Sequence, residues 1–368
     1  MPIDPAARAG GILTIDLAAI QGNYRRLQKK LGGTACAAVV KADAYGLGAS
    51  EVGPALWTAG ARRFFVAMPD EGIRLRRSLP DAEIYILGGL FEDAEEAYFG
   101  HDLRPVLNSL REVRLWADFR RRRQSRLAAA LQIDSGMNRL GLPKEEVTAL
   151  QQAEDILQNL DLCFVMSHLA SADEAGNVQN QEQLTRFRTS LDHFPKLAAS
   201  LANSSGIFLG AAYHFDLARP GAALYGINPT PGQANPMQPV VQLQARVLQV
   251  RNIQPGDRVG YGGRFQAEKP GRIATVAVGY ADGFLRYLSD RGSAWFQGTR
   301  LPLAGLVSMD VAGVDVTGLP PDRLKPGDLV ELLGPNQGVD DLAAQAGTIG
   351  YEILTALGRR YHRVYRGA

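Results

Sequence analysis

Residues 38–49 read AVVKADAYGLGA. In this stretch an apolar run ends at a single lysine, Lys41, and an aspartate, a tyrosine and two glycines follow immediately. A lysine is almost never fully buried unless it is paired, so a surface lysine at the end of a core strand is the simplest interpretation. The glycines would let the backbone turn away from that strand. Whether Lys41 has a function depends on what the rest of the chain places beside it.

This stretch belongs to the first of eight short apolar runs that precede residue 230, and helical patterns connect most of them. Ahead of it, residues 16–32 have the apolar spacing of a helix and end on a glycine. Continuous rather than alternating apolar runs indicate a parallel sheet covered on both faces. Eight such units predict a TIM-type (β/α)8 barrel, although counting strands does not exclude a doubly wound sheet. The eight runs are residues 37–41, 64–68, 83–89, 103–107, 127–134, 160–168, 197–203 and 221–227.

The texture of the chain changes at residues 228–239, which are rich in proline, glycine and asparagine and are typical of a linker. Beyond them come short β runs with glycine and proline turns and few helices. We therefore predict an α/β barrel over residues 12–236 and a smaller, mostly β C-terminal domain over residues 237–368, joined by residues 1–11. The strand-like run GILTIDL, residues 11–17, is a candidate partner for the sheet of this second domain.

The composition excludes several classes of partner. Hydrophobic residues make up 46% and charged residues 21% of the 368 residues, which is ordinary for a globular chain. A net charge of +2 offers no electrostatic case for nucleic acid or a membrane surface. Two cysteines, Cys36 and Cys163, imply no disulfide framework and fit a reducing compartment. Since the sequence shows neither a signal-peptide pattern nor an apolar run long enough to cross a membrane, we expect a cytoplasmic protein.

Polar side chains recur where the predicted strands end, which is where barrel enzymes place their active residues. Taken singly, each has an ordinary explanation: His168 as a core histidine, the NSSG loop as a helix cap, and Arg219 as a surface arginine. Together they gather a lysine, a histidine, two arginines and a hydroxyl–glycine loop at one end of the barrel, so we predict a site there. The candidates are Lys41, Asp134, Asn138, Arg139, His168, Ser171, Asn203, Ser204, Ser205, Arg219 and Gly221.

These residues suit the chemistry of a phosphorylated cofactor. The hydroxyls and backbone N–H groups of NSSG, residues 203–206, suit a phosphate group. A lysine opposite such a loop suggests pyridoxal phosphate held as a Schiff base. The segment GLGASE, residues 46–51, has a glutamate where a dinucleotide fingerprint needs its third glycine. This argues against the hypothesis that the chain is a dehydrogenase with a Rossmann fold. The sequence also lacks persuasive metal-ligand spacing and a G-x-S-x-G elbow.

The stretch AVVKADAYGLGA resembles the pyridoxal-phosphate lysine motif of the alanine racemases, and six further motifs resemble that family in the family's order. They are MNRLG (137–141), SHLASADE (167–174), HFDLARPGAALYG (214–226), GYGGRF (260–265), VAVGYADGF (276–284) and SMDV (308–311). The similarity covers roughly residues 10–365. It implies a homodimeric racemase that interconverts L- and D-alanine with pyridoxal 5'-phosphate and supplies D-alanine for peptidoglycan.

The resemblance implies two catalytic bases. Lys41 would carry the cofactor and act as one base, and Tyr261 of the partner subunit would act as the other, so the active site would be shared across a dimer interface. Unperturbed, a tyrosine has a pKa of about 10 and a lysine a pKa of about 10.4, so their surroundings must lower both. His168 and then Arg219 would support Tyr261, with Arg219 directed at the pyridine nitrogen. Because arginine stays protonated and only donates, the ring would be a weak electron sink.

The resemblance also assigns residues to the cofactor phosphate and to the substrate. Arg139 and the backbone N–H of Met309 would bind the substrate carboxylate, and Tyr280 would narrow the entrance. Met309 and Asp310 would come from the partner subunit. Tyr280 and Tyr351 also have the ordinary interpretation of packed aromatic side chains. The phosphate would be held by Tyr45, Asn203, Ser204, Gly221, Ala222 and Tyr351.

One position departs from the family pattern. Many members have a lysine, which can be carbamylated to hold the arginine of MNRLG, at the position of Gln132. Glutamine cannot be carbamylated, so Arg139 would need another partner, such as the Gln132 amide or a bound anion. The hypothesis fails if a structure shows Arg139 fixed by an acidic side chain.

Four other functions stay open: a racemase of broader specificity for serine or other small amino acids, a non-catalytic pyridoxal-phosphate carrier, a decarboxylase, and a barrel scaffold or partner-binding protein without chemistry. The second domain, with Tyr261 and Asp310, speaks against the carrier, which consists of the barrel alone. The decarboxylase would place a glutamate opposite the pyridine nitrogen, where this chain has Arg219.

Overall fold

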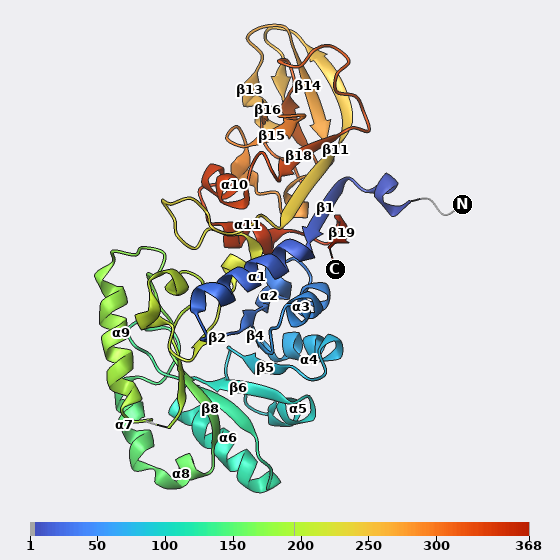
Figure 1. Ribbon diagram of the computed structural model, residues 1–368. Helices are drawn as coiled ribbons and strands as arrows, with labels where there is room; N and C mark the ends of the chain where they lie inside the picture. Colours follow the sequence, from blue (N-terminus) through green and yellow to red (C-terminus); the bar gives the residue numbers. More distant parts are fainter. Residues whose placement is uncertain (1–3, 195, 368) are drawn as a thin grey trace.

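The apolar runs of the first part of the chain form a curled parallel sheet (Figure 1). The structure, a computed structural model, describes residues 4–194 and 196–367. Strands β3 to β9 lie side by side in sequence order, and all of their pairings are parallel. The strands of this region are β2 (Ala35–Cys36), β3 (Ala38–Val39), β4 (Arg63–Val66), β5 (Glu83–Ile86), β6 (Leu103–Leu107), β7 (Ala128–Gln132), β8 (Asp161–Met166), β9 (Ala198–Ser200) and β10 (Leu217–Ala218).

Strand β10 closes this sheet into a barrel. It pairs in parallel with β2, with Leu217 opposite Ala35. On its other side, the backbone N–H of Arg219 donates to the carbonyl of Ala202 at 2.9 Å. Counting β2 and β3 as one interrupted strand, the barrel has eight strands, which confirms the predicted fold class and leaves no place for a doubly wound open sheet.

The eighth strand is not where the sequence pattern predicted it. Residues 221–227 form the 3-10 helix η4 (Ala222–Tyr225), and the strand is β10, which ends before Arg219. A short, fully buried apolar run has the same pattern in a helix and in a strand, so periodicity does not distinguish them. As a consequence Arg219 follows its strand, at the end of the barrel where active residues belong.

Helices cover the outside of the barrel, and the first shows why they form where they do. The Asp16 carboxylate caps α1 by accepting from the Ala19 N–H at 2.8 Å, and Gly32 ends the helix with a φ of 60°. Between these caps Ile20 and Leu27 are buried at helical spacing. The helices of the barrel are α1 (Leu17–Leu31), α3 (Ala49–Thr58), α4 (Pro69–Ser78), α5 (Glu95–Gly100), α6 (Leu110–Arg123), α7 (Lys144–Gln152), α8 (Glu154–Gln158) and α9 (Val178–Leu191), with the 3-10 helices η2 (Gly206–Phe208) and η3 (Ala211–Tyr213).

The remaining strands form a second, mostly β region above the barrel mouth (Figure 1). Its sheet includes the N-terminal strand β1 (Gly11–Asp16), which pairs antiparallel with β11 and parallel with β19. The run GILTIDL therefore lies in this sheet, while the division at residues 236/237 stays a prediction. The other strands are β11 (Val241–Ile253), β12 (Arg258–Val259), β13 (Phe265–Gln266), β14 (Gly271–Val276), β15 (Ser293–Phe296), β16 (Thr299–Pro302), β17 (Ala312–Asp315), β18 (Leu329–Leu333) and β19 (His362–Arg366). The helices are η1 (Pro5–Arg8), η5 (Tyr261–Gly263), η6 (Tyr280–Asp282), η7 (Arg286–Leu288), α10 (Val339–Gln345) and α11 (Gly350–Ala356).

Over residues 4–194 and 196–367, no helix is both long enough and apolar enough to cross a membrane. Within the same ranges, no group of three or more His, Cys, Asp or Glu side chains is placed to hold a metal ion.

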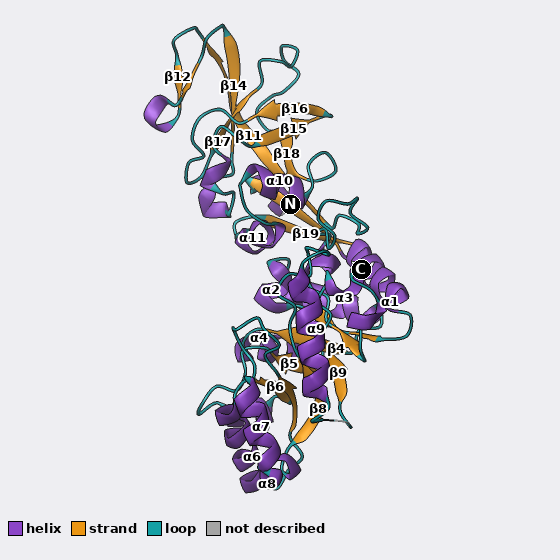
Figure 2. Ribbon diagram, turned by 90° about the vertical axis from the view of Figure 1, so that its left-hand side faces the viewer, coloured by secondary structure: helices purple, strands orange, loops and turns teal. Residues whose placement is uncertain are grey.

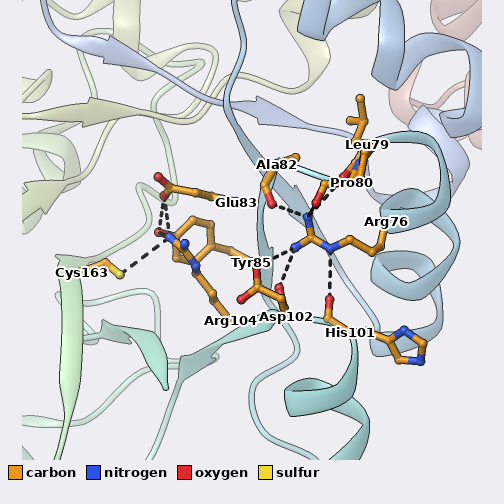
Figure 3. Close-up of polar contacts among 10 residues, drawn as sticks. All are labelled: Arg76, Leu79, Pro80, Ala82, Glu83, Tyr85, His101, Asp102, Arg104 and Cys163. Carbon is orange, nitrogen blue, oxygen red and sulfur yellow. Dashed lines mark hydrogen bonds and ion pairs between the residues drawn. The ribbon is translucent and has the colours of Figure 1, made fainter. Parts of the chain in front are cut away.

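A polar network lies at the amino ends of the barrel strands (Figure 3). The Arg104 guanidinium lies 2.7 Å from Glu83 Oε2 and donates to the Tyr85 hydroxyl at 3.0 Å, while that hydroxyl donates to Glu83 at 2.9 Å. Burial raises the pKa of Glu83, but Arg104, the Tyr85 hydroxyl and Arg63 outweigh burial and hold that pKa below its ordinary value. Beside this network, Arg76 on α4 donates to the backbone carbonyls of Leu79, Pro80, Ala82, His101 and Asp102.

We expect the Arg104→Leu variant to unfold at lower urea concentration, with a loss of about 1–3 kcal/mol at pH 7, because it removes the guanidinium that pairs with Glu83 and donates to the Tyr85 hydroxyl. The contribution of Glu83 is present above its ordinary pKa of about 4.3 and is lost as the pH falls through its lowered folded-state pKa. The difference between variant and wild type is therefore expected to shrink below pH 4. The exposed Arg111, which pairs with Glu92, supplies the control, since Arg111→Leu is expected to cost less than about 0.5 kcal/mol. An equal loss at every pH would contradict the assignment.

Candidate active site

Lys41 stands at the end of β3 and opens an unusual turn, α2 (Lys41–Tyr45). Residues 42–45 all have φ between 53° and 55°, which makes one turn of left-handed helix built without glycine. Such a conformation costs about 1–2 kcal/mol per residue, so the surroundings must enforce it. Glu71 on α4 accepts the Ala42 N–H at 2.6 Å, and the Asp43 carboxylate accepts the Ala49 N–H at 2.8 Å. Glu71 thus holds a backbone group of the turn, and Asp43 ties the turn to the first residue of α3.

The C-terminal strand β19 also supports this turn, although more than 300 residues separate them. Arg363 donates to the carbonyl of Gly46 at 2.7 Å, and the Tyr365 hydroxyl donates to the carbonyl of Leu47 at 2.9 Å. Gly48 has a φ of 97°, and a Cβ at this position would clash with the Tyr365 hydroxyl. The glycine is therefore required for close approach as well as for the turn.

A cavity of about 330 Å³ lies at the barrel mouth beside Lys41. It gathers ten of the residues that the sequence predicted for the site, from the ends of five barrel strands and from α11. Leu87 and Thr355 also line it and were not predicted, although Leu87 ends an apolar run as the other site residues do. The ten predicted residues are Lys41, Tyr45, Arg139, His168, Asn203, Ser204, Arg219, Gly221, Ala222 and Tyr351.

The Lys41 amine is placed to act as a base or nucleophile. Burial lowers the pKa of Lys41, the nearby Arg139 lowers it further, and only Glu71 opposes the shift. A lysine with a lowered pKa offers more of its neutral amine at neutral pH, which is the form that attacks carbonyl carbons and accepts protons.

One end of the cavity forms a cradle of hydrogen-bonding groups. The Ser204 hydroxyl accepts the N–H of Gly221 at 3.0 Å and that of Ala223 at 3.1 Å. The Tyr45 hydroxyl lies so close to Gly221 that a Cβ there would clash with it. The Tyr45 ring packs against the rings of Tyr225 and Tyr351, with centroids 4.7 and 5.9 Å away. Hydroxyl and amide groups at one point, with room kept by a glycine, suit a phosphate-sized anion.

A buried arginine, Arg219, also lines the cavity and is only 3% exposed. Its guanidinium donates to the Ser200 hydroxyl and to the Ser167 carbonyl at 2.6 Å, and it lies 3.5 Å from His168 Nδ1. Burial lowers the pKa of Arg219 to about 9. Burial, Arg219, Arg139 and Lys41 together lower the pKa of His168 to about 3, so this imidazole is neutral at pH 7.

The structure does not pair Arg139 with Gln132. The Gln132 amide donates instead to the carbonyl of Leu140 at 3.1 Å, which fixes the backbone of the loop and leaves the guanidinium exposed. In the part of the chain that the structure describes, no ion pair or side-chain hydrogen bond of Arg139 is found. Because arginine only donates, the Gln132 Oε1 would have to accept from it, and no such hydrogen bond is found among the described residues, so the suggestion of the Gln132 amide as partner was wrong. A bound anion beside Arg139 stays a prediction.

Four candidates from the barrel, Asp134, Asn138, Ser171 and Ser205, do not line this cavity, and neither do four predicted site residues of the second region. Tyr261 lies on η5, between β12 and β13, and its side chain is 73% exposed. Figure 2 shows that hairpin at the far end of the second region, away from α2. Met309 and Tyr280 are exposed as well, and Asp310 forms an ion pair with Arg360 at 2.7 Å. The chain does not bring these four residues to its own Lys41.

The barrel, the strand-end lysine and the anion cradle define an enzyme that works through an amine at the barrel mouth. Family models of the alanine racemase N-terminal and C-terminal domains match residues 15–229 and 240–365. The chain therefore belongs to the alanine racemase family.

Individual relatives agree over nearly the whole chain. A protein of Mesorhizobium japonicum, named a catabolic alanine racemase, is 53% identical over 367 residues, which are 100% of this chain and 96% of the relative. An alanine racemase of Brucella ovis is 51% identical over 97% of this chain and 94% of its own length. The crystal structure of the Bartonella henselae alanine racemase with covalently bound pyridoxal phosphate superimposes with a TM-score of 0.94 at 42% identity, covering 97% of this chain and 100% of that one.

Proposed function

We propose that this protein interconverts L-alanine and D-alanine by moving a proton at Cα, with pyridoxal 5'-phosphate as cofactor. The observation that carries the proposal is the half-buried Lys41 in a cavity that is also lined by the cradle of Tyr45, Ser204 and Gly221. Membership of the alanine racemase family supports it.

The residues of the cavity fit the cofactor. Lys41 would bind it covalently, and Tyr45, Ser204 and Tyr351 would hold its phosphate together with the backbone of residues 203, 221 and 222. When bound, pyridoxal phosphate supplies an electron-withdrawing ring that makes the Cα proton of an amino acid more acidic. Arg219 would face the ring as a donor that keeps its proton at neutral pH, so the ring would be a weak electron sink. This would favour return of the proton to Cα.

Inversion at Cα needs one base on each face of the substrate. The lowered pKa of Lys41 suits it to one face. We assign the other face to Tyr261 of a second subunit, because the exposed Tyr261 does not reach the cavity of its own chain. Neutral His168, backed by Arg219, would stabilise the tyrosine in its ionised form by hydrogen bonding.

This assignment makes the protein a homodimer with shared active sites. The second region exposes large side chains that a partner would cover, including Tyr261, Tyr280 and Met309. Met309 and Asp310 of the partner would reach the substrate side of the cavity, where Arg139 would bind the substrate carboxylate. Tyr280 of the partner would narrow the entrance and favour a methyl side chain, whereas a wider entrance would admit serine and other small amino acids.

In the cell, we propose that the protein acts in the cytoplasm and supplies D-alanine for peptidoglycan. The relatives from Mesorhizobium japonicum and Rhizobium johnstonii are named catabolic alanine racemases, which favours alanine breakdown as a second candidate role. Deleting the gene distinguishes the two: dependence of growth on added D-alanine supports cell-wall synthesis, and a defect only on alanine as carbon source supports catabolism.

The activity is tested by giving purified protein and pyridoxal phosphate L-alanine in heavy water. We expect D-alanine that carries deuterium at Cα, without pyruvate, when the products are separated on a chiral column and weighed by mass spectrometry. Exchange without inversion would show that the second base is misassigned. The absence of both exchange and D-alanine would refute the proposal for alanine.

Cofactor affinity should depend on the glycine of the cradle. In the Gly221→Ala variant the new Cβ would clash with the Tyr45 hydroxyl and come within 3.3 Å of Val39 Cβ, so we expect affinity for pyridoxal phosphate to fall roughly 10–100-fold. Absorbance titration of the apoprotein measures this. Gly100→Ala is the matched control, because a Cβ there meets no atom within 4 Å. Equal affinity of the two variants would contradict the phosphate assignment.

A further inference from the structure

Helix α9 presents two glutamines, Gln179 and Gln183, to the loops that follow β7 and β8. The two residues are one helical turn apart, so their side chains share one face of the helix. Gln183 is completely buried, and Gln179 is half-buried. A buried primary amide is costly unless its donors and acceptor are used, so its partners indicate what it holds.

Gln183 binds both loops at once. Its Oε1 accepts the backbone N–H of Ala170 at 2.8 Å, and its Nε2 donates to the carbonyl of His168 at 2.8 Å. The same Nε2 donates to the Ser135 hydroxyl at 3.3 Å. Ala170 and His168 belong to the loop after β8, and Ser135 belongs to the loop after β7. The amide therefore has a partner for its acceptor and for both of its donor hydrogens.

Gln179 repeats this bridge one turn earlier. Its Oε1 accepts from the Ser171 hydroxyl at 2.7 Å, and its Nε2 donates to the carbonyl of Gly136 at 3.3 Å. Two loops that start from neighbouring strands are thus held at five points by one helix face. The bridge therefore joins the loop that contains His168 to residues 135 and 136 of the loop after β7.

The bridge continues into the buried wall of the cavity. The hydroxyls of Ser135 and Ser167 lie 2.7 Å apart, and the Ser167 carbonyl accepts from Arg219 at 2.6 Å. Lys41 is not part of this network, because its turn is held by Glu71, Asp43 and β19. The two sides of the cavity are therefore supported by separate sets of contacts.

We infer that Gln183 and Gln179 are positioning residues that set the place of His168, and through it the proton transfer on the Tyr261 face, without acting on the Lys41 face. This inference rests on the proposed two-base function. It predicts an effect on only one of the two proton transfers, which a general loss of stability would not produce.

The first test measures the loops directly and needs no activity. Gln183→Met removes the polar amide at nearly constant volume, and Gln181→Met, on the same helix but exposed, is its control. We expect amide hydrogen exchange of residues 168–171 to become at least about tenfold faster in Gln183→Met alone, with residues 42–48 unchanged. Unchanged exchange at 168–171, or an equal increase at 42–48, would overturn the inference whether or not the protein interconverts alanine.

The second test uses the holoenzyme with L- and D-alanine deuterated at Cα. We expect kcat/KM of Gln183→Met to fall roughly 10–100-fold, by the same factor in both directions because the enantiomers have equal free energy. The deuterium isotope effect on kcat/KM is expected to rise for the enantiomer whose proton goes to Tyr261 and to fall for the other. Isotope effects that change equally for both enantiomers would overturn the inference.

If Gln183→Met does not fold, the milder variant Gln179→Met can be used in both tests. We expect the same faster amide exchange and the same opposite shifts of the two isotope effects, all smaller in size. Failure of the proposed function would be distinguishable, because the wild-type protein itself would then not interconvert alanine. The hydrogen-exchange experiment would still test whether Gln183 positions the loop of His168.

Discussion

The Lys41→Ala variant is expected to lose alanine interconversion by on the order of 10⁴-fold or more, because it removes both the covalent link to the cofactor and one of the two bases. Pyridoxal phosphate should still enter the cavity, since Tyr45, Ser204 and Gly221 are untouched, but it should leave on desalting. Absorbance of the desalted protein and chiral analysis of the product measure the two losses separately.

The control for this experiment is Lys29→Ala, which removes an exposed lysine at the end of α1. It should retain the cofactor and full activity. If Lys41→Ala kept the cofactor through desalting, another lysine would carry it and the assignment of the whole cavity would be wrong. If it lost the cofactor yet retained activity, Lys41 would not be a catalytic base.

The second large effect concerns the origin of Tyr261. Tyr261→Phe is expected to keep the cofactor bound but to reduce turnover by about 10²–10⁴-fold, because phenylalanine cannot accept a proton. When Lys41→Ala and Tyr261→Phe subunits are mixed and allowed to exchange, hybrid dimers combine one intact site with one doubly altered site. Random pairing should then restore about one quarter of wild-type activity.

Recovery in the mixture is informative because each variant alone is inactive. If Lys41 and Tyr261 of the same chain formed a site, every site in every dimer would contain one substitution, and mixing would restore nothing. A matched mixture of Lys41→Ala with Gly221→Ala subunits should not gain activity beyond the sum of its parts, since both residues line the cavity of one chain. Activity measured after size-exclusion chromatography of the mixture distinguishes these results.

The barrel was predictable because the signals for it are local. Continuous apolar runs of strand length, separated by amphipathic segments, occur throughout residues 37–203, and each coincides with a strand of the barrel. The prediction was wrong only for residues 221–227, where a buried 3-10 helix carries the same apolar pattern as a strand. The end of β10, and with it the position of Arg219, depends on backbone bonds to β2 and to Ala202, which no local pattern contains.

Most residues of the site could also be predicted from the sequence, because they lie in a few short motifs at the ends of predicted strands. Nine of the ten residues gathered in the cavity come from such motifs, and the tenth, Tyr351, lies on α11. The family to which the chain belongs agrees with the resemblance that the sequence showed. By contrast, the Gln132 amide, one of the two partners suggested for Arg139, donates to the Leu140 carbonyl instead, because a side-chain amide forms its hydrogen bonds with whichever groups the fold brings near.

The sequence by itself therefore determined the class of fold, the lysine and the set of residues around it. Only the tertiary structure decided how those residues are held: the left-handed turn enforced by Glu71 and β19, and the bridge from α9 to the loop of His168. Apolar periodicity and short motifs each involve only a few neighbouring residues, so they can be recognised in the sequence without knowing the fold. Support for the site comes from contacts such as that of Tyr365 with Leu47, which lie far apart in sequence and meet only when the chain has folded.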